Sequence, residues 1–210
     1  MTENEASQPT NIADGVGPTT PGGSPDPGGS SSVWEGGTIR LRAVAVDDWP
    51  AFEAWERDDE SNRRSYMIPF PRSAEATRKW VEDAATREYG GDLFRWVIER
   101  HDGVPVGTIN THTCDARNGT FSVGLAIGQG HRGHGYAGQA IRLVLRFYFE
   151  ELRYQKVNAH VYGFNDASRR LHERLGFQLE GRIRRMIYSM GTYHDTLVFG
   201  LTAEEFASGG

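Results

Sequence analysis

The sequence predicts an α+β fold in which a mixed, mostly antiparallel sheet carries helices on both of its faces. Three observations support this fold class. Stretches that alternate polar and apolar residues follow one another through short turns between residues 94 and 127. A glycine-rich loop then leads into one long helix with an apolar face. Another strand follows that helix, and such a strand–helix–strand crossover makes its two strands parallel.

The two ends of the chain are expected to lie outside the folded domain. Residues 1–36 are rich in Gly, Pro and Ser and hold acidic but no basic side chains, which predicts a disordered acidic tail. The formal net charge of −5 resides in this tail, because acids and bases balance in the remaining chain. Trp34 is the exception in the tail, and its docking on the domain is left open. The domain is expected to span residues 37–204, and residues 205–210 are expected to form a flexible C-terminus.

The first half of the domain is expected to contain one strand and two helices. Proline punctuates it: Pro50 fits a first helical turn, whereas the prolines of Ile68–Pro71 force extended geometry. The expected elements, in order, are a strand over Thr38–Val44, a helix that Asp47 caps, a polar break over Asp58–Arg64, and a helix from Ser73 to about Tyr89.

The second half is expected to contain most of the sheet. Its turns carry Asp-Gly, Asn-Gly and Met-Gly pairs, which favour tight reversals of the chain. The expected elements are strands over Phe94–Glu99, Val104–Thr113 and Thr120–Ile127, a glycine loop over Gly128–Gly135, a helix over Ala137–Leu152, a strand over Lys156–Tyr162, a helix from Asn165 to Gly176, and a closing hairpin from Phe177 to Leu201.

Bulk composition excludes several classes of protein. The folded part has no basic stripe, so no nucleic-acid partner is expected. No run approaches 18 apolar residues, so no membrane span or membrane partner is expected. Cys114 is the single cysteine, so no disulfide can form within the chain, and a reducing compartment is expected. With no secretory signal at the N-terminus, the expected location is cytoplasmic.

The glycine loop Gly128–Ala137 carries most of the functional information. Its glycines allow backbone N–H groups to approach an anion, and the start of the next helix adds the positive end of a helix dipole. Arg132 supplies a positive side chain in the same loop. Together these features predict a cradle for a pyrophosphate group.

Three interpretations of this loop compete. It could be a tight turn without a ligand. It could be a dinucleotide site, because Gly133–Gly138 fits G-x-G-x-x-G, but antiparallel strands precede the loop and no carboxylate ends the next strand at Tyr162. The third interpretation is a coenzyme A site. A nucleoside-triphosphate loop is excluded, because no Gly-Lys-Ser/Thr is present.

Arg132–Ala137 resembles the acetyl-CoA motif Arg/Gln-x-x-Gly-x-Gly/Ala of the GNAT superfamily of N-acetyltransferases. Asn165–Ser168, followed by Leu175–Phe177, is similar to the second motif of that family. Leu179–Arg185 and Gly191–Asp195 look like its RimJ/RimL branch. The resemblance covers about residues 38–202. It implies a GNAT-like sheet with a splayed central parallel strand pair and acetyl-CoA as co-substrate. It also implies transfer of the acetyl group, by direct attack, to a primary amine of a protein N-terminus, a polyamine or another small molecule.

The resemblance also implies roles for individual residues. His172 occupies the position where many relatives carry a tyrosine that protonates the departing thiolate, although it could instead be an ordinary surface histidine. Asn165 and Ser168 share its helix face and are expected to assist catalysis and to contact the cofactor, although Asn165 could act only as a helix cap. The expected cofactor contacts are Val123, Leu125, Ile127, Arg132, Gly133, His134, Gly135, Tyr136, Ala137, Asn165 and Ser168.

Several points stay open in the sequence. The general base is one, because Ser122 stands where many family members place a glutamate; a water relay to Glu53, Glu56 or Asp115, or a role for His112, are the alternatives. No metal site is expected. A non-catalytic acetyl-CoA-binding module is the alternative to an enzyme. The expected partner is an amine-bearing small molecule or a peptide N-terminus, and a homodimer is left open.

Overall fold

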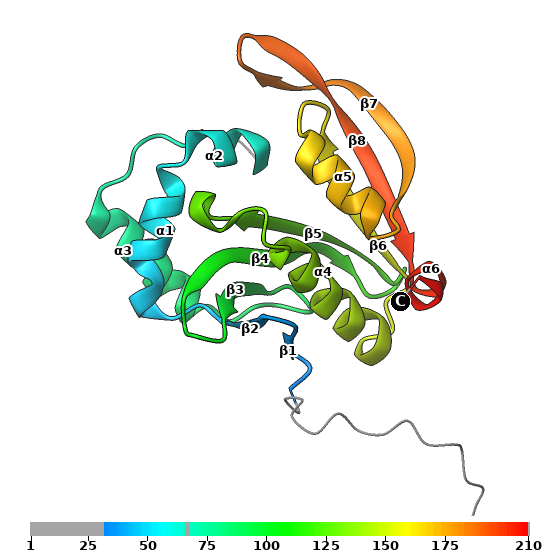
Figure 1. The fold of residues 1–210 in the computed structure, drawn as a ribbon, viewed down its shortest axis with the longest axis horizontal. Coiled ribbons are helices and arrows are strands. Elements are labelled where there is room, and N and C mark those ends of the chain that lie inside the picture. The colour runs from blue at the N-terminus through cyan, green and yellow to red at the C-terminus, as the bar shows by residue number, and fades with distance from the viewer. Residues whose placement is uncertain (1–31, 66–67, 210) are drawn as a thin grey trace, which may run out of the picture.

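The computed structural model describes residues 32–65 and 68–209 and contains one eight-stranded sheet of order β1-β2-β3-β4-β5-β6-β8-β7 (Figure 1). Every neighbouring pair is antiparallel except β5–β6, which is parallel. The mixed, mostly antiparallel sheet with helices on its faces confirms the predicted fold class. The strands are β1 (Glu35–Gly36), β2 (Ile39–Ala43), β3 (Arg95–Arg100), β4 (Pro105–Asp115), β5 (Thr120–Ile127), β6 (Lys156–Tyr162), β7 (Gln178–Ser189) and β8 (Thr192–Thr202).

The four predicted helices occur in the predicted order, together with others that the sequence did not predict. Ser73 accepts a hydrogen bond from Ala76 N and caps α3 as expected, and Asn165 caps α5 in the same way. α4 continues without a break into one turn of π-helix, η3. The helices are η1 (Val46–Asp48), α1 (Trp49–Glu56), α2 (Asp59–Ser65), α3 (Ala74–Ala85), η2 (Gln129–His131), α4 (Tyr136–Arg146), η3 (Phe147–Glu151), α5 (Asp166–Arg174) and α6 (Ala203–Ser208). None of the helices in the described ranges is long and apolar enough to cross a membrane.

Two apolar cores lie on the two faces of the sheet. On β3, Trp96 and Ile98 belong to the larger core, which also holds the apolar stripe of α4, whereas Val97 belongs to the smaller core with side chains of α1 and α3. This division follows from strand geometry, because successive side chains point to opposite faces. Figure 1 shows α4 and α5 together against one face of the sheet, beside the ends of β5 and β6.

The parallel pair β5–β6 stays together for only three residues. Thr120, Phe121 and Ser122 pair with Lys156, Val157 and Asn158, and no pairing follows, although β4 stays paired with β5 as far as Ile127. The second half of β5 therefore diverges from β6, as the splayed pair implied by the resemblance requires.

Asp47 does not cap α1, because it lies within η1 and Asp48 occupies the N-cap position without a side-chain cap bond. Two further local predictions were wrong. The expected polar break is helix α2, because Asp58 Oδ1 accepts a hydrogen bond from Ser61 N and the acidic first turn and basic last turn suit the helix dipole. α3 ends at Ala85 rather than near Tyr89, since Tyr89 instead packs against Phe94. Both corrections arise from local contacts that composition does not reveal.

The fold extends past the expected boundaries at both ends of the domain. Trp34 packs against Trp96 and Phe147, with ring centroids 5.2 and 4.5 Å away, and β1 pairs with β2. Residues 205–208, expected to be flexible, belong to α6, which Thr202 caps and whose Phe206 packs on Phe149. The part of the predicted tail before residue 32 lies outside the described residues.

Candidate active site

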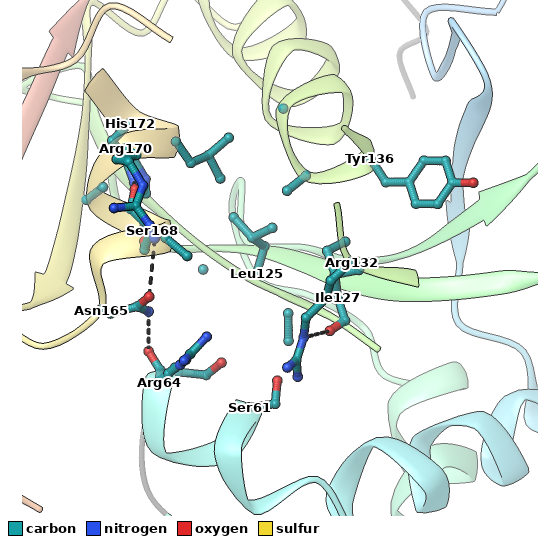
Figure 2. A pocket seen from close by; sticks show the side chains of 18 of the residues that line it. Ser61, Arg64, Leu125, Ile127, Arg132, Tyr136, Asn165, Ser168, Arg170 and His172 are labelled. Atoms are coloured by element: carbon teal, nitrogen blue, oxygen red, sulfur yellow. Dashed lines mark hydrogen bonds between the residues drawn. The ribbon is translucent and has the colours of Figure 1, made fainter. Parts of the chain in front are cut away.

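A cavity of about 520 Å³ opens where β5 and β6 diverge. Its walls come from β5, β6, the glycine loop, the first turn of α4, α5 and the end of α2. Figure 2 shows side chains of α5 on one side of the cavity and those of α2 and the glycine loop on the others. Strand, loop and helix thus enclose one space, large enough for part of an extended ligand.

One edge of β5 faces this cavity with unpaired backbone groups. Gly128 N, just beyond β5, donates to Val106 O on β4 at 2.9 Å. Because backbone N–H groups alternate in direction along a strand, those of Val123, Leu125 and Ile127 point away from β4, toward β6. The pairing of Ser122 with Asn158 engages the N–H of Val123, so those of Leu125 and Ile127 open into the gap that β6 leaves. Val123, Leu125 and Ile127 are the three strand residues that the sequence predicted as cofactor contacts, and all three line the cavity.

The glycine loop has the geometry of an anion site. Gly133 and Gly135 adopt φ values of +81° and +80°, which strain any residue with a Cβ. The first N–H to donate within α4 belongs to Gln139, which bonds to Gly135 O at 3.2 Å, and no side chain caps the helix. The N–H groups of Tyr136 and Ala137 therefore precede the first intrahelical bond. These groups fit the pyrophosphate of coenzyme A.

Arg132 borders the cavity but already has partners. Its Nε donates to Ile127 O at 3.2 Å, and its guanidinium forms an ion pair with Asp58, at the start of α2. The ion pair joins the glycine loop to the α1–α2 connection. The charge of Arg132 is thus shared with Asp58 in this structure.

His134 is the one predicted contact whose side chain does not line the cavity. Its ring stacks on that of Tyr136, with centroids 5.5 Å apart, and its Nδ1 lies 3.3 Å from His131 O. It borders a separate hollow with Thr38 and His101. Its neighbours Gly133 and Gly135 line the main cavity, whereas His134 does not.

Asn165 closes one corner of the cavity. Its Oδ1 accepts from Ser168 N at 3.2 Å, which caps α5, and its Nδ2 donates to Arg64 O at 3.1 Å, which joins α5 to the end of α2 (Figure 2). The cap and the contact across the cavity coexist. Ser168 lies one turn further along α5 and lines the same cavity.

His172 is buried, with 4% of its surface exposed, between the rings of Phe177 and Phe199. Its Nδ1 lies 2.8 Å from Ser168 O and donates to that carbonyl, and it lies 3.4 Å from Ser168 Oγ. Burial lowers the pKa of His172. The hydrogen bond to the carbonyl of Ser168 raises this pKa, but it offsets only part of the effect of burial. At neutral pH the imidazole is therefore uncharged, and its Nε2 can accept a proton but cannot donate one. This excludes the surface-histidine interpretation.

The remote carboxylates considered as proton acceptors do not line the cavity. Each is engaged elsewhere: Glu53 with Arg57, Glu56 with Arg72 and Thr77, and Asp115 with Asn118. Ser122 is buried and accepts a hydrogen bond from Thr113 Oγ1 at 2.9 Å.

Sequence reasoning missed several residues of the cavity wall. Ser61 and Arg64 come from α2, which was not predicted, and Arg170 and Arg174 lie on α5. His160 could have been found, because alternation along β6 buries Val157, Ala159 and Val161 and turns His160 to the other face. Within the described ranges the cavity wall contains four arginines and no carboxylate.

Comparisons of the sequence with known proteins agree on one family. A family model described as "Acetyltransferase (GNAT) domain" matches residues 38–178. The SPbeta prophage-derived uncharacterized N-acetyltransferase YokL of Bacillus subtilis is 45% identical over 175 residues, which cover 83% of this chain and 96% of that protein. The ribosomal-protein-serine acetyltransferase of Escherichia coli is 26% identical over 166 residues, which cover 77% of this chain and 91% of that protein.

Solved structures share the fold. One described as "Probable acetyltransferase" is 26% identical, with a TM-score of 0.72 over 83% of this chain and 97% of that one. The spermidine N-acetyltransferase of Vibrio cholerae, in complex with CoA and spermine, is 19% identical, with a TM-score of 0.71 over 81% of this chain and 98% of that one. At 19% identity, the similarity to the spermidine enzyme shows a shared fold and nothing further.

Proposed function

The chain belongs to the GNAT family of N-acetyltransferases, which use acetyl-CoA, and from this premise we propose that it acetylates a primary amine by direct attack in the cavity between β5, β6 and α5. One observation carries the proposal: the gap of the splayed strands and the uncapped start of α4 border the same cavity. An extended thioester ligand needs both features, a slot for its arm and an anion site for its pyrophosphate.

The cofactor would lie along β5 with its pyrophosphate at the glycine loop. The backbone N–H groups of Gly133–Ala137 would hold the phosphate oxygens, and those of Leu125 and Ile127 would bond the pantetheine arm and the thioester oxygen. Val123 would contact the arm where it lines the cavity. Fixed N–H donors at that oxygen stabilise the negative charge that develops on it during attack. Arg132 would assist the phosphates from the edge of the loop.

The thiolate that leaves must gain a proton, and we assign its delivery to the hydroxyl of Ser168. His172 was expected to donate this proton itself, but its lowered pKa and its Nδ1 bond to Ser168 O favour a positioning role. In that role the imidazole would fix the turn of α5 that carries Ser168. Asn165 would fix the start of the same helix and contact the pantetheine.

The charge of the cavity wall bears on the acceptor. A polyamine carries several positive charges and needs carboxylates to hold them, whereas the described wall offers Arg64, Arg132, Arg170, Arg174 and no acid. The spermidine enzyme of similar fold acts on a polyamine, and the Escherichia coli relative is named for ribosomal-protein serine. We therefore favour an acceptor that is not a polyamine, such as a peptide N-terminus or a small molecule with one amine and no further positive charge.

Two measurements test the proposal. Acetyl-CoA at 100 times its dissociation constant should stabilise the protein by about 2.7 kcal/mol, which raises the melting temperature by about 5–10 °C. Thiol release should then be faster with an N-terminal serine peptide than with spermidine. Absence of any thermal protection by millimolar acetyl-CoA would refute the cofactor site. Protection without turnover on any amine would instead support the alternative, a non-catalytic acetyl-CoA-binding module.

A further inference from the structure

A row of polar side chains crosses the sheet on the face opposite α4 and α5. His112 on β4 pairs with Ser122 on β5, and Ser122 pairs with Asn158 on β6, so the three side chains share one face. The apolar side chains of β6 point to the other face, into the larger core. The polar row marks the last point at which β5 and β6 stay paired.

His160 stands immediately beyond this row, at the opening of the gap. It lies two residues after Asn158 on the same face of β6, as Gly124 lies two residues after Ser122 on β5. Both His160 and Gly124 line the cavity. A Cβ at Gly124 would lie only 3.3 Å from Asn110 Oδ1, so glycine suits this crowded position and leaves the backbone of β5 uncovered by a side chain. An exposed imidazole thus borders the cavity from β6, beside the stretch of β5 that is no longer paired with β6.

Of the two histidines on this face, His160 lines the cavity and His112 does not. His112 is its titratable neighbour on β4, and the pKa of His112 is lowered by partial desolvation and by the nearby charge of His160. On β6 the next charged side chain of the same face is Lys156, which is paired with Glu180 of β7 at 2.7 Å. From α2, Arg64 lines the cavity. Neither Lys156 nor Arg64 competes as a proton acceptor, because ammonium and guanidinium groups donate hydrogen bonds and have no acceptor atom.

We propose that His160 is the general base that accepts the proton of the attacking amine; this rests on the proposed acetyl transfer in the same cavity. The amine nitrogen forms a bond to the thioester carbon, and the carbon–sulfur bond breaks. One proton leaves the nitrogen for the imidazole of His160, and the departing sulfur gains one proton from the α5 side of the gap. The imidazole then returns its proton to solvent, and the donor on the α5 side regains one from solvent, so atoms and charge balance over one turnover. The amine thus loses its proton on the β6 side of the gap, and the departing sulfur gains its proton on the α5 side.

The sharpest test compares two substitutions of equal shape. His160→Gln removes the base, and His160→Glu supplies a different one in nearly the same volume. We expect the glutamine variant to lose about 10²–10⁴-fold in kcat/KM for the amine, the usual contribution of general acid–base catalysis. Thermal protection by acetyl-CoA and the KM for acetyl-CoA should stay within about twofold of the wild type. The glutamate variant should recover at least tenfold over the glutamine variant.

The pH profile supplies a second readout. In the glutamine variant kcat/KM should rise with pH as the free amine forms, without the separate acid limb that an enzymatic base gives to the wild type. The control is His101→Gln, because that exposed hairpin histidine contacts Gly37 O and lies outside the cavity.

Three results would overturn the assignment. One is a glutamine variant with nearly wild-type kcat/KM and an unchanged pH profile. That result would refute His160 as the base but would not contradict the proposed acetyl transfer. Another is equal activity of the glutamine and glutamate variants, since a positioning role does not distinguish their basicity. The third is a wild-type protein that binds acetyl-CoA but turns over no amine, which would refute the proposed function together with the base.

Discussion

Individual side chains of the cavity differ in how they hold their protons. The imidazole of His172 is enclosed by aromatic rings and bonded through Nδ1 to a carbonyl of its own helix. Burial disfavours its charged form and lowers its pKa. A tyrosine at this position would present a hydroxyl proton, whereas this histidine presents an acceptor. The proton donor is therefore better sought in Ser168, one turn earlier on α5.

His172→Phe tests this environment through the pH dependence of stability. The unfolded chain binds a proton at His172 near pH 6.5, and the folded protein binds it only at lower pH. The contribution of His172 to stability is thus present above pH 6.5 and is lost as the pH falls below it, by up to about 1.4 kcal/mol per pH unit. We expect the phenylalanine variant to lose less stability than the wild type between pH 6.5 and pH 5 in urea unfolding.

The exposed His101 provides the control for this measurement. His101→Gln removes a histidine from the exposed hairpin and is unfolded in urea at the same pH values. Identical acid limbs in the wild type and the His172→Phe variant would show that His172 titrates normally, and a role as proton donor would then be restored. Thiol release by the same variant should fall about three- to tenfold if His172 positions Ser168, and an unchanged rate would remove it from the mechanism.

At the scale of elements, the site depends on the divergence of β5 from β6 and on the first turn of α4. β5 and β6 diverge after three paired residues, and α4 starts at a glycine in the left-handed region with no side-chain cap. Both features leave backbone donors without partners, which a folded protein tolerates only where water or a ligand satisfies them. α2 adds a wall that reaches α5 through the bond between Asn165 and Arg64 O.

Gly133→Ala tests the loop as an anion site. Its φ of +81° costs a residue with a Cβ about 1–2 kcal/mol, and relaxation of that strain would turn the neighbouring N–H groups away from the phosphates. We expect the KM for acetyl-CoA to rise about tenfold or more. Gly130→Ala is the matched control, because Gly130 lies in the same loop with open space and without a positive φ. Equal KM values for the two variants would contradict the proposed cradle.

At the scale of the whole molecule, the segment before β2 completes the larger core. Trp34 packs on Trp96 and Phe147, although it lies inside the segment that composition assigns to the tail. At the other end of the sheet, Phe206 of α6 packs on Phe149. Both segments join the core through one aromatic ring each.

Trp34→Ala should therefore lower the free energy of unfolding by about 2–3 kcal/mol, below the cost at a fully buried aromatic because Trp34 is half-buried. Val33→Ala is the control, since Val33 is 43% exposed and should change stability by at most about 0.5 kcal/mol. Urea unfolding measures both. If Trp34→Ala lowers the free energy of unfolding no more than Val33→Ala does, Trp34 does not stabilise the core.

Much of the fold follows from local patterns in the sequence. Strand alternation, turn glycines and the caps Ser73 and Asn165 predict the element order, and the motif around Gly133 predicts where the cofactor should lie. These signals are legible because they act between residues a few positions apart, through hydrogen bonds and periodic burial. α2 escaped because its polar residues resemble a loop, and its stabilising contacts involve Asp58 and Glu56 just outside it.

The sequence by itself determined the sheet class, the family and the glycine loop with its splayed neighbour. Only the tertiary structure decided that Trp34 belongs to the core, that His172 is buried and uncharged, and that Arg64 and His160 border the cavity. The physical reason is distance along the chain. Burial lowers a pKa through atoms contributed by many segments, and a cavity wall joins α2, β6 and α5, so neither can be computed from neighbours in sequence.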